Sequence, residues 1–234
     1  MYLRSARYYD ALYGFKDYKA TSKAVDALIR KENPEASRIL DVACGTGKHL
    51  AELSSGYEVE GLDLNTGLLE IARARCPAAT FHQGDMSDFQ LDTSFDVITC
   101  LYSSISYVKT RERLFSAIRA MAAHLTRGGI LLIEPWFTPE TYWVGHLAAN
   151  FVDEPDLKIS WMYVSAIKDG MTILDIHYQV GTPQGVTQFR ELHELGLFTR
   201  EDHLAAFAEA GLVATYDEVG FFGRGLYVAR AGGA

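Results

Sequence analysis

The sequence predicts an α/β protein with a doubly wound, mostly parallel sheet of seven strands and a small antiparallel β insertion. Between residues 38 and 134, short apolar runs alternate with segments of helical periodicity, as parallel strands joined by crossover helices do. Strand-like runs at 213–219 and 226–229 follow a late helix, and we expect them to complete the sheet. The pattern changes after residue 134, which predicts an insertion over residues 135–195 between an N-terminal part, 1–134, and a C-terminal part, 196–234.

Composition narrows the class of protein. The 234 residues are 48% apolar and 22% charged, which is ordinary for a globular chain with a substantial core. No apolar run approaches the roughly 20 residues of a membrane span, and the net charge of −8 argues against a general nucleic-acid surface. Cys44, Cys76 and Cys100 are widely spaced, which predicts a reducing, cytoplasmic compartment and no metal site.

The first twenty residues are unusually rich in aromatic side chains. Tyr9, Leu12 and Tyr13 have the spacing i, i+3, i+4, so one helix would present them together. Two interpretations remain open for this segment. It is either a helix packed on the core or a lid whose rings close over a bound cofactor and exclude water. A second helix is expected from Tyr18 to about Arg30.

Residues 38–50 read as a buried strand, a glycine turn and the start of a helix. Gly45 and Gly47 let another molecule approach the main chain closely, and the helix start offers unpaired N–H groups to an anion. This combination predicts a site for a nucleotide-type cofactor. The dinucleotide fingerprint needs a third glycine where this chain has Leu50, which disfavours NAD or FAD.

Acidic residues end the next two predicted strands. Asp63 ends residues 57–64, at about the twenty-residue distance where a carboxylate binds ribose hydroxyls in such folds. Asp85 and Met86 end a third strand over residues 81–86. A fourth buried strand, 95–101, is expected to end at the same crevice, where doubly wound folds bind their ligands.

The remaining elements follow from periodicity and turn residues. Helices are expected at about 47–54, 66–75 and 110–126, with residues 126–129 as a helix stop before the strand 130–133. Alternating segments at 159–167, 171–180 and 186–195 predict the antiparallel insertion, with a hairpin turn at 168–170 after a polar link. Thr199 is expected to cap a helix over residues 200–209.

Together these motifs resemble the class I S-adenosylmethionine (SAM) methyltransferases, a Rossmann-like fold, and more narrowly the bacterial dTDP-amino-sugar N,N-dimethyltransferases of antibiotic biosynthesis. The narrower resemblance is carried by short motifs spread over nearly the full length: residues 40–47, 82–86, 103–105, 134–136, 139–140, 197–198 and 223–226. It implies SAM as the cofactor and in-line transfer of methyl groups to the amine of a nucleotide-linked sugar.

The resemblance also implies roles for individual residues. On the cofactor it places Tyr9, Tyr18, Ala43, Asp63, Asp85, Met86 and Leu101, to which the backbone argument adds Gly45. Near the acceptor it places Tyr2, Tyr107, Trp136, Ser165 and Arg224. The chain departs from the family it resembles at two positions: members of that family often have glutamate where this chain has Asp63, and some have histidine where it has Tyr107. The hypothesis of a nucleotide-sugar substrate depends mainly on Arg224, because a diphosphate needs cations and the insertion has few of them.

Methyl transfer from SAM needs positioning more than strong acid or base. The amine must be neutral to attack, so Tyr107 is expected to orient or deprotonate it, with Tyr2 and Tyr13 as further candidates. Two alternatives stay open: methylation of an N or O acceptor on another small metabolite, and a SAM-binding protein without turnover. A homodimer through the β insertion is also considered.

Overall fold

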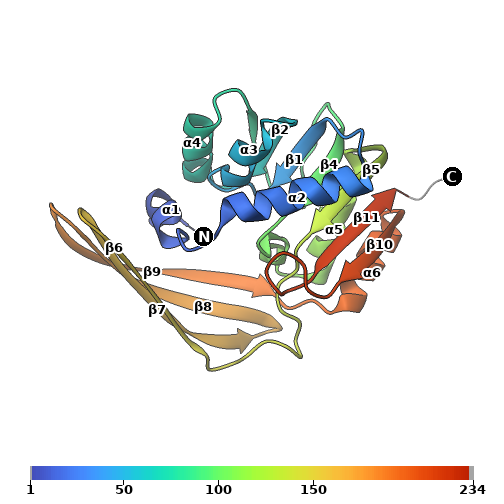
Figure 1. The fold of residues 1–234 in the computed structure, drawn as a ribbon. Helices are drawn as coiled ribbons and strands as arrows, with labels where there is room; N and C mark the ends of the chain where they lie inside the picture. Colours follow the sequence, from blue (N-terminus) through green and yellow to red (C-terminus); the bar gives the residue numbers. More distant parts are fainter. Residues whose placement is uncertain (1, 232–234) are drawn as a thin grey trace.

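The computed structural model describes residues 2–231 and has two sheets (Figure 1). The larger has seven strands in the order β10-β11-β5-β4-β1-β2-β3. Their bounds are β1 Arg38–Val42, β2 Glu58–Asp63, β3 Thr80–Gln83, β4 Phe95–Cys100, β5 Leu125–Ile133, β10 Leu212–Asp217 and β11 Leu226–Ala231. Five of these pair in parallel, and β11 runs antiparallel to both of its neighbours. The predicted fold class is confirmed.

Helices cover both faces of this sheet. Their bounds are η1 Ala6–Tyr8, α1 Tyr9–Leu12, α2 Tyr18–Glu32, α3 Lys48–Leu53, α4 Thr66–Arg75, η2 Ser104–Val108, α5 Arg111–Ala123 and α6 Arg200–Glu209. One buried cluster joins the sheet to α5 and α6, and a second joins it to α2, α3 and α4. The strand order reverses at β1, which has β2 on one side and β4 on the other. Such a reversal opens a crevice at the carboxyl ends of these strands.

The end of α5 differs from the prediction. The helix stops at Ala123 and β5 begins at Leu125, so residues 126–129 belong to a strand rather than to a helix stop. The pairing of β4 with β5 shifts register here, and Gly128 adopts a φ of +79°. A bulge of this kind adds residues to one strand without ending it, and local sequence does not distinguish it from a turn.

The second sheet is antiparallel and has the order β6-β7-β8-β9. Its strands are β6 Leu147–Glu154, β7 Leu157–Lys168, β8 Met171–Thr182 and β9 Gly185–Gly196. The predicted hairpin turn is confirmed, because Asp169 and Gly170 both adopt the positive φ of a two-residue loop. The prediction of a polar link was wrong for β6. β6 is an edge strand with exposed faces, so it tolerates polar residues, and these made the segment resemble a loop.

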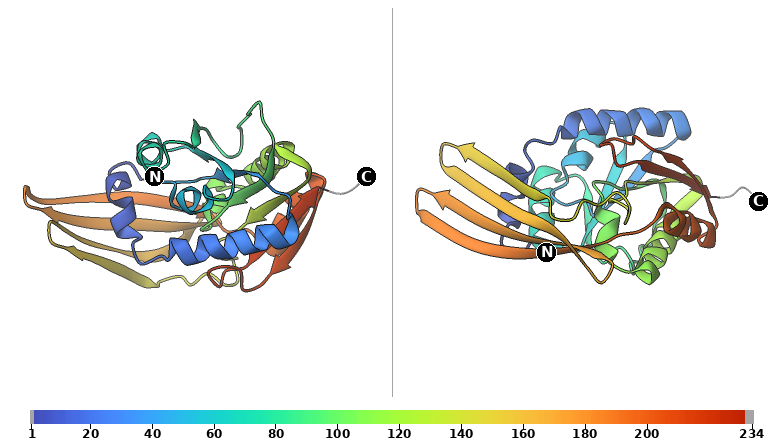
Figure 2. Two further views of the ribbon diagram at one scale, coloured as in Figure 1. Left: turned by 45° about the horizontal axis from the view of Figure 1, so that its top comes forward. Right: turned by 90° about the horizontal axis from the view of Figure 1, so that it is seen from below.

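The second sheet closes the crevice from one side. Its inner face packs on α1 and on aromatic side chains near η2, and in both views of Figure 2 it extends past the larger sheet, on the side away from the C-terminus. The N-terminal segment therefore lies between the two sheets. No helix within residues 2–231 is long and apolar enough to cross a membrane.

The core beneath α6 gives a stability prediction. The ring of Phe207 is fully buried, whereas Leu204 on the same helix is 37% exposed. Phe207→Ala should lower the free energy of unfolding by about 3–5 kcal/mol, because it leaves a cavity. Leu204→Ala, the matched control, should lower it by about 0.5 kcal/mol. Urea titration followed by circular dichroism measures both, and equal losses would contradict the packing described.

Candidate active site

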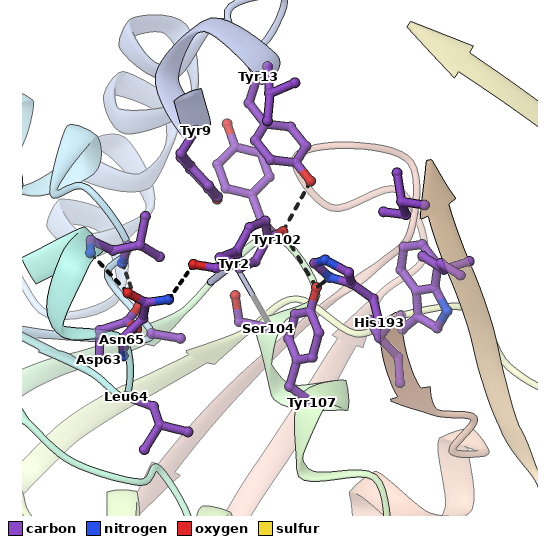
Figure 3. Close-up of a pocket in the computed structure, with 18 of the residues that line it drawn as sticks. Tyr2, Tyr9, Tyr13, Asp63, Leu64, Asn65, Tyr102, Ser104, Tyr107 and His193 are labelled. Carbon is purple, nitrogen blue, oxygen red and sulfur yellow. Dashed lines mark hydrogen bonds between the residues drawn. The ribbon is translucent and has the colours of Figure 1, made fainter. Parts of the chain in front are cut away.

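A cavity of about 310 Å³ lies where the crevice, the N-terminal segment and the inner face of the second sheet meet (Figure 3). Most of the residues predicted for a site line it: Tyr2, Tyr9, Tyr13, Ala43, Gly45, Asp63, Asp85, Met86, Tyr107, Trp136 and Arg224. Tyr18 and Leu101 line a smaller hollow of about 30 Å³, which shares Tyr9 and Gly45 with the main cavity. Residues distant in sequence thus meet at one place.

Ser165 lies outside both hollows. It is buried, and its hydroxyl donates a hydrogen bond to the carbonyl of Trp143 (2.5 Å) and accepts one from the N–H of His146 (2.9 Å). These bonds hold the start of β6 against β7. The serine is placed to organise the sheet rather than to contact a molecule in the cavity.

The glycine turn presents bare backbone to the cavity. Ala43, Gly45 and Gly47 all have positive φ, at 61°, 56° and 72°. A Cβ at Gly45 would be strained and would come within 3.9 Å of the Tyr9 ring, filling space that now belongs to the cavity. This is the shape that a flat, polar ligand needs to rest on the main chain.

Asp63 holds the turn in place. It is 8% exposed, and its carboxylate accepts hydrogen bonds from the N–H groups of Gly45 (2.9 Å) and Asn65 (2.8 Å). Burial raises the pKa of Asp63, although these backbone bonds oppose the change. The side chain of Asn65 donates to the carbonyl of Tyr2 (2.9 Å), which ties the N-terminal segment to the end of β2.

The Asp85 carboxylate interacts with Ser87 and Arg113. It accepts a hydrogen bond from the N–H of Ser87 (2.9 Å) and pairs with Arg113 (2.6 Å). Partial burial acts to raise the pKa of Asp85, but the bonds from Ser87 and Arg113 outweigh it and leave the pKa lowered. Asp85 therefore offers a fixed negative charge beside Met86.

Three tyrosine hydroxyls gather at the centre of the cavity (Figure 3). The Tyr2 hydroxyl lies 3.0 Å from that of Tyr13 and 3.5 Å from that of Tyr107. The Tyr107 hydroxyl in turn lies 2.9 Å from Nδ1 of His193 on β9. Burial is the main reason that the pKa of each tyrosine is raised, so the hydroxyls stay neutral and act as hydrogen-bond partners.

Two cations lie at another part of the cavity wall. The Arg224 guanidinium sits 4.7 Å from the centre of the Trp136 ring and donates to Oγ of Ser103 (3.3 Å). The Lys16 ammonium lies 3.7 Å from the centre of the Tyr102 ring. Burial, reinforced by the charge of Arg224, lowers the pKa of Lys16 to about 7. A cation held in this way gains most from an anionic ligand.

Sequence reasoning did not single out several residues that the fold brings here. Sequence analysis assigned no role to Lys16, and it included Glu134, now 1% exposed with its pKa raised to about 7 by burial, only within the motif 134–136. The second sheet adds an aromatic wall in which Trp161 and Tyr163 are nearly parallel at 5.8 Å. Their i, i+2 spacing was a usable signal, but it does not say which face of the strand is covered.

Comparison with known proteins identifies the family of the chain. Residues 39–129 match the family model described as a methyltransferase domain. The dTDP-3-amino-3,4,6-trideoxy-alpha-D-glucopyranose N,N-dimethyltransferase of Streptomyces venezuelae is 40% identical over 91% of each chain. The dTDP-4-amino-2,3,4,6-tetradeoxy-D-glucose N,N-dimethyltransferase of Saccharopolyspora spinosa is 38% identical over 94% of this chain and 90% of its own.

A solved structure shows the same fold. SAM-bound CalS10, an amino pentose methyltransferase from Micromonospora echinaspora involved in calicheamicin biosynthesis, superposes with a TM-score of 0.85 at 37% identity, over 93% of this chain and 92% of its own. Identity of this extent, over nearly the whole of each protein, settles the classification. The chain belongs to the SAM-dependent methyltransferases, in the family of the dTDP-amino-sugar N,N-dimethyltransferases.

Proposed function

We propose that the protein transfers two methyl groups, one after the other, from SAM to the amino group of a dTDP-linked deoxy amino sugar. The observation that carries this proposal is the meeting, in one cavity, of Asp63 at a strand end with the cations Lys16 and Arg224. The carboxylate suits a ribose diol, and the cations suit a diphosphate. The names of the relatives support the same substrate class.

The donor is assigned to the strand ends. Asp63 would bind the ribose hydroxyls, Ala43 and Gly45 would lie beneath the cofactor, and Asp85 with Met86 would hold the adenine. Tyr9 and Tyr18 would line its other side together with Leu101, and aromatic faces suit a sulfonium cation. When bound, SAM supplies a methyl carbon already activated by positive sulfur. The protein supplies geometry, which removes on the order of 7–11 kcal/mol of barrier.

The acceptor is assigned to the side that carries the cations and the second sheet. Arg224 and Lys16 would bind the diphosphate, and the charge of the diphosphate would favour the protonated form of Lys16. Trp136 and the aromatic wall of β7 would pack on the base and the sugar. Residues 135–195 would thus serve the acceptor, and residues 1–134 with 196–234 the donor. Lys16 would be the second cation of this subsite, beside Arg224, and sequence analysis had not placed it there.

Turnover with defined acceptors tests the proposal. Incubation with SAM and a series of dTDP-amino sugars should add first one and then two methyl groups to the sugar. Mass spectrometry measures the gain in mass. The matched dTDP-sugars with a hydroxyl in place of the amine should gain none. Methylation of the hydroxyl sugars would move the activity to oxygen. Binding of SAM without any product across the series would leave only a SAM-binding protein.

Two variants should separate the donor and acceptor ends. Arg224→Gln should weaken dTDP binding about 10–100-fold, because it removes a charge-assisted contact, and leave binding of S-adenosylhomocysteine unchanged. Asp63→Asn should do the reverse, with a loss of about 10-fold for S-adenosylhomocysteine. Isothermal titration calorimetry with each ligand alone measures both. Parallel losses in both variants would show that the assignments are wrong.

We also propose that two copies pair through the outer face of the second sheet. Leu147 and Val164 face each other across β6 and β7 and are 66% and 56% exposed, and Phe151 on β6 is 68% exposed. Apolar side chains gathered in this way are typical of an interface. In analytical ultracentrifugation the native protein should sediment as a dimer and Phe151→Asp as a monomer. Val213→Asp, equally exposed on β10, is the control and should remain dimeric. A native monomer would exclude the pairing.

We retain the cytoplasm as the proposed compartment. Cys44, Cys76 and Cys100 are all buried free thiols, and this supports an environment in which disulfides do not form.

A further inference from the structure

A buried carboxylate and an imidazole stand behind Tyr107, and the proposed methyl transfer does not yet use them. Glu191 and His193 are two residues apart on β9, so their side chains share one face of the strand. They are 7% and 2% exposed. Only His193 lines the cavity, and it does so beside Tyr107 (Figure 3).

Glu191 is held as a carboxylate. It accepts hydrogen bonds from the N–H groups of Arg4 (2.6 Å) and Ser5 (3.1 Å) and from the Ser5 hydroxyl. Burial acts to raise the pKa of Glu191, but the neighbouring His193 ring and these bonds outweigh it and lower the pKa to about 2. A fixed negative charge therefore lies in the wall behind the cavity.

The position of this charge selects the tautomer of His193. Nε2 lies 3.8 Å from the Glu191 carboxylate and has no hydrogen-bond partner within residues 2–231. A proton on Nε2 would face the negative charge, whereas a lone pair there would be repelled by it. Nδ1 is then left with the lone pair, and it lies 2.9 Å from the Tyr107 hydroxyl. Tyr107 donates to His193 in this arrangement. Its oxygen then accepts from the Tyr2 hydroxyl at 3.5 Å and has a second lone pair for a donor in the cavity.

We propose that Tyr107, His193 and Glu191 form a relay that removes a proton from the acceptor amine before each methyl transfer. The inference rests on the proposed function and deepens it. Tyr107 is the catalytic residue, since it faces the substrate. His193 accepts the proton through it, and Glu191 positions and stabilises the charged ring.

The proton balance shows why such a relay is useful. An ammonium has no lone pair, so one proton must pass to the Tyr107 oxygen while the Tyr107 proton passes to Nδ1, which gives an imidazolium beside a carboxylate. The nitrogen then forms its bond to the methyl carbon, and the carbon–sulfur electron pair stays on sulfur. The methylated nitrogen is again positively charged. It must lose a proton before it can attack a second time, and the imidazolium must first release its own proton to solvent.

The groups that face His193 from each packed element are compatible with this role. The N-terminal segment contributes the Tyr2 ring, 4.7 Å from the His193 ring, and the Tyr2 hydroxyl contacts that of Tyr13. η2 contributes Tyr107, and β8 places apolar Leu174 opposite His193 in register. Glu191 is thus the one anion among these neighbours within the described chain. The N-terminal segment also brings a cation, because the Arg4 guanidinium lies 4.7 Å from the centre of the Phe189 ring, on the same face of β9 as Glu191.

The tautomer is tested without turnover. In the native protein labelled with ¹⁵N-histidine, His193 should carry its proton on Nε2, and its Nδ1 resonance should shift in Tyr107→Phe, which removes the donor. The spectrum of His193→Asn identifies the resonance among the seven histidines. A proton on Nδ1, or an Nδ1 resonance that does not respond to Tyr107→Phe, would overturn the relay.

The kinetic test uses the pH profile of kcat/KM with SAM and a dTDP-amino sugar. Asparagine at position 193 keeps a hydrogen-bond partner for Tyr107 but cannot take up a proton. His193→Asn should therefore lose about 100-fold at pH 7, with the loss shrinking to about 3-fold above the pKa of the amine, where the substrate is already neutral. Glu191→Gln should lose about 10-fold at pH 7 with the same trend.

The control is His177→Asn, the same change on the exposed face of the same sheet, which should follow the native profile. A loss by the same factor at every pH would show that His193 is structural and would overturn the relay. Failure of the proposed function has a different signature: the native protein would form no methylated sugar, and the relay would then be judged by the tautomer of His193 alone.

Discussion

The Asp63 carboxylate accepts hydrogen bonds from the backbone N–H groups of Gly45 and Asn65, and these bonds fix the ends of two neighbouring strands relative to each other. The turn after β1 adopts positive φ at Ala43, Gly45 and Gly47, a path that costs free energy unless neighbouring contacts hold it. Asp63 supplies such contacts from the end of β2. The cavity takes its shape from this pair of strand ends, and the remaining walls are arranged around them.

The other walls come from parts of the chain that have no reason to meet until the fold forms. The N-terminal segment is tied to β2 through Asn65 and Tyr2, and to β9 through Arg4, Ser5 and Glu191. It therefore joins the two sheets across the cavity. The second sheet contributes the aromatic wall and the histidine, and the loop before β11 contributes Arg224. In the proposed assignment, a site divided in this way would let the donor side stay constant while the acceptor side varies.

Sequence alone predicted the larger sheet and most of the residues that line the cavity, because short stretches of sequence determine these features. A strand followed by Gly45 and Gly47, or a strand ending in Asp63, shows its geometry within ten residues. His193 and Lys16 gave no such signal, because their importance comes from burial and from partners more than eighty residues away. β6 was missed for a different reason: it is an exposed edge strand, and its polar residues resemble those of a loop.

For some residues of the site, the sequence suggested the residue but not its partners. Tyr2 and Tyr107 were placed near the acceptor by resemblance, with Tyr13 as a further candidate to contact the amine, and the fold gathers their hydroxyls into one chain of contacts. Ser165 was placed by resemblance alone, and its hydroxyl is used within the sheet. Sequence thus suggested candidate residues, and tertiary structure decided which partners each of them has.

The hydrogen bonds between the N-terminal segment and Glu191 have a consequence for ligand exchange. Any opening of the cavity that swings this segment outward breaks the bonds from Arg4 and Ser5. The carboxylate would then lose the donors that compensate its burial, so the open state is disfavoured. Each round of methylation consumes one SAM, so an opening of this kind would have to occur between the two rounds, and the bonds from Arg4 and Ser5 would form again before the second transfer.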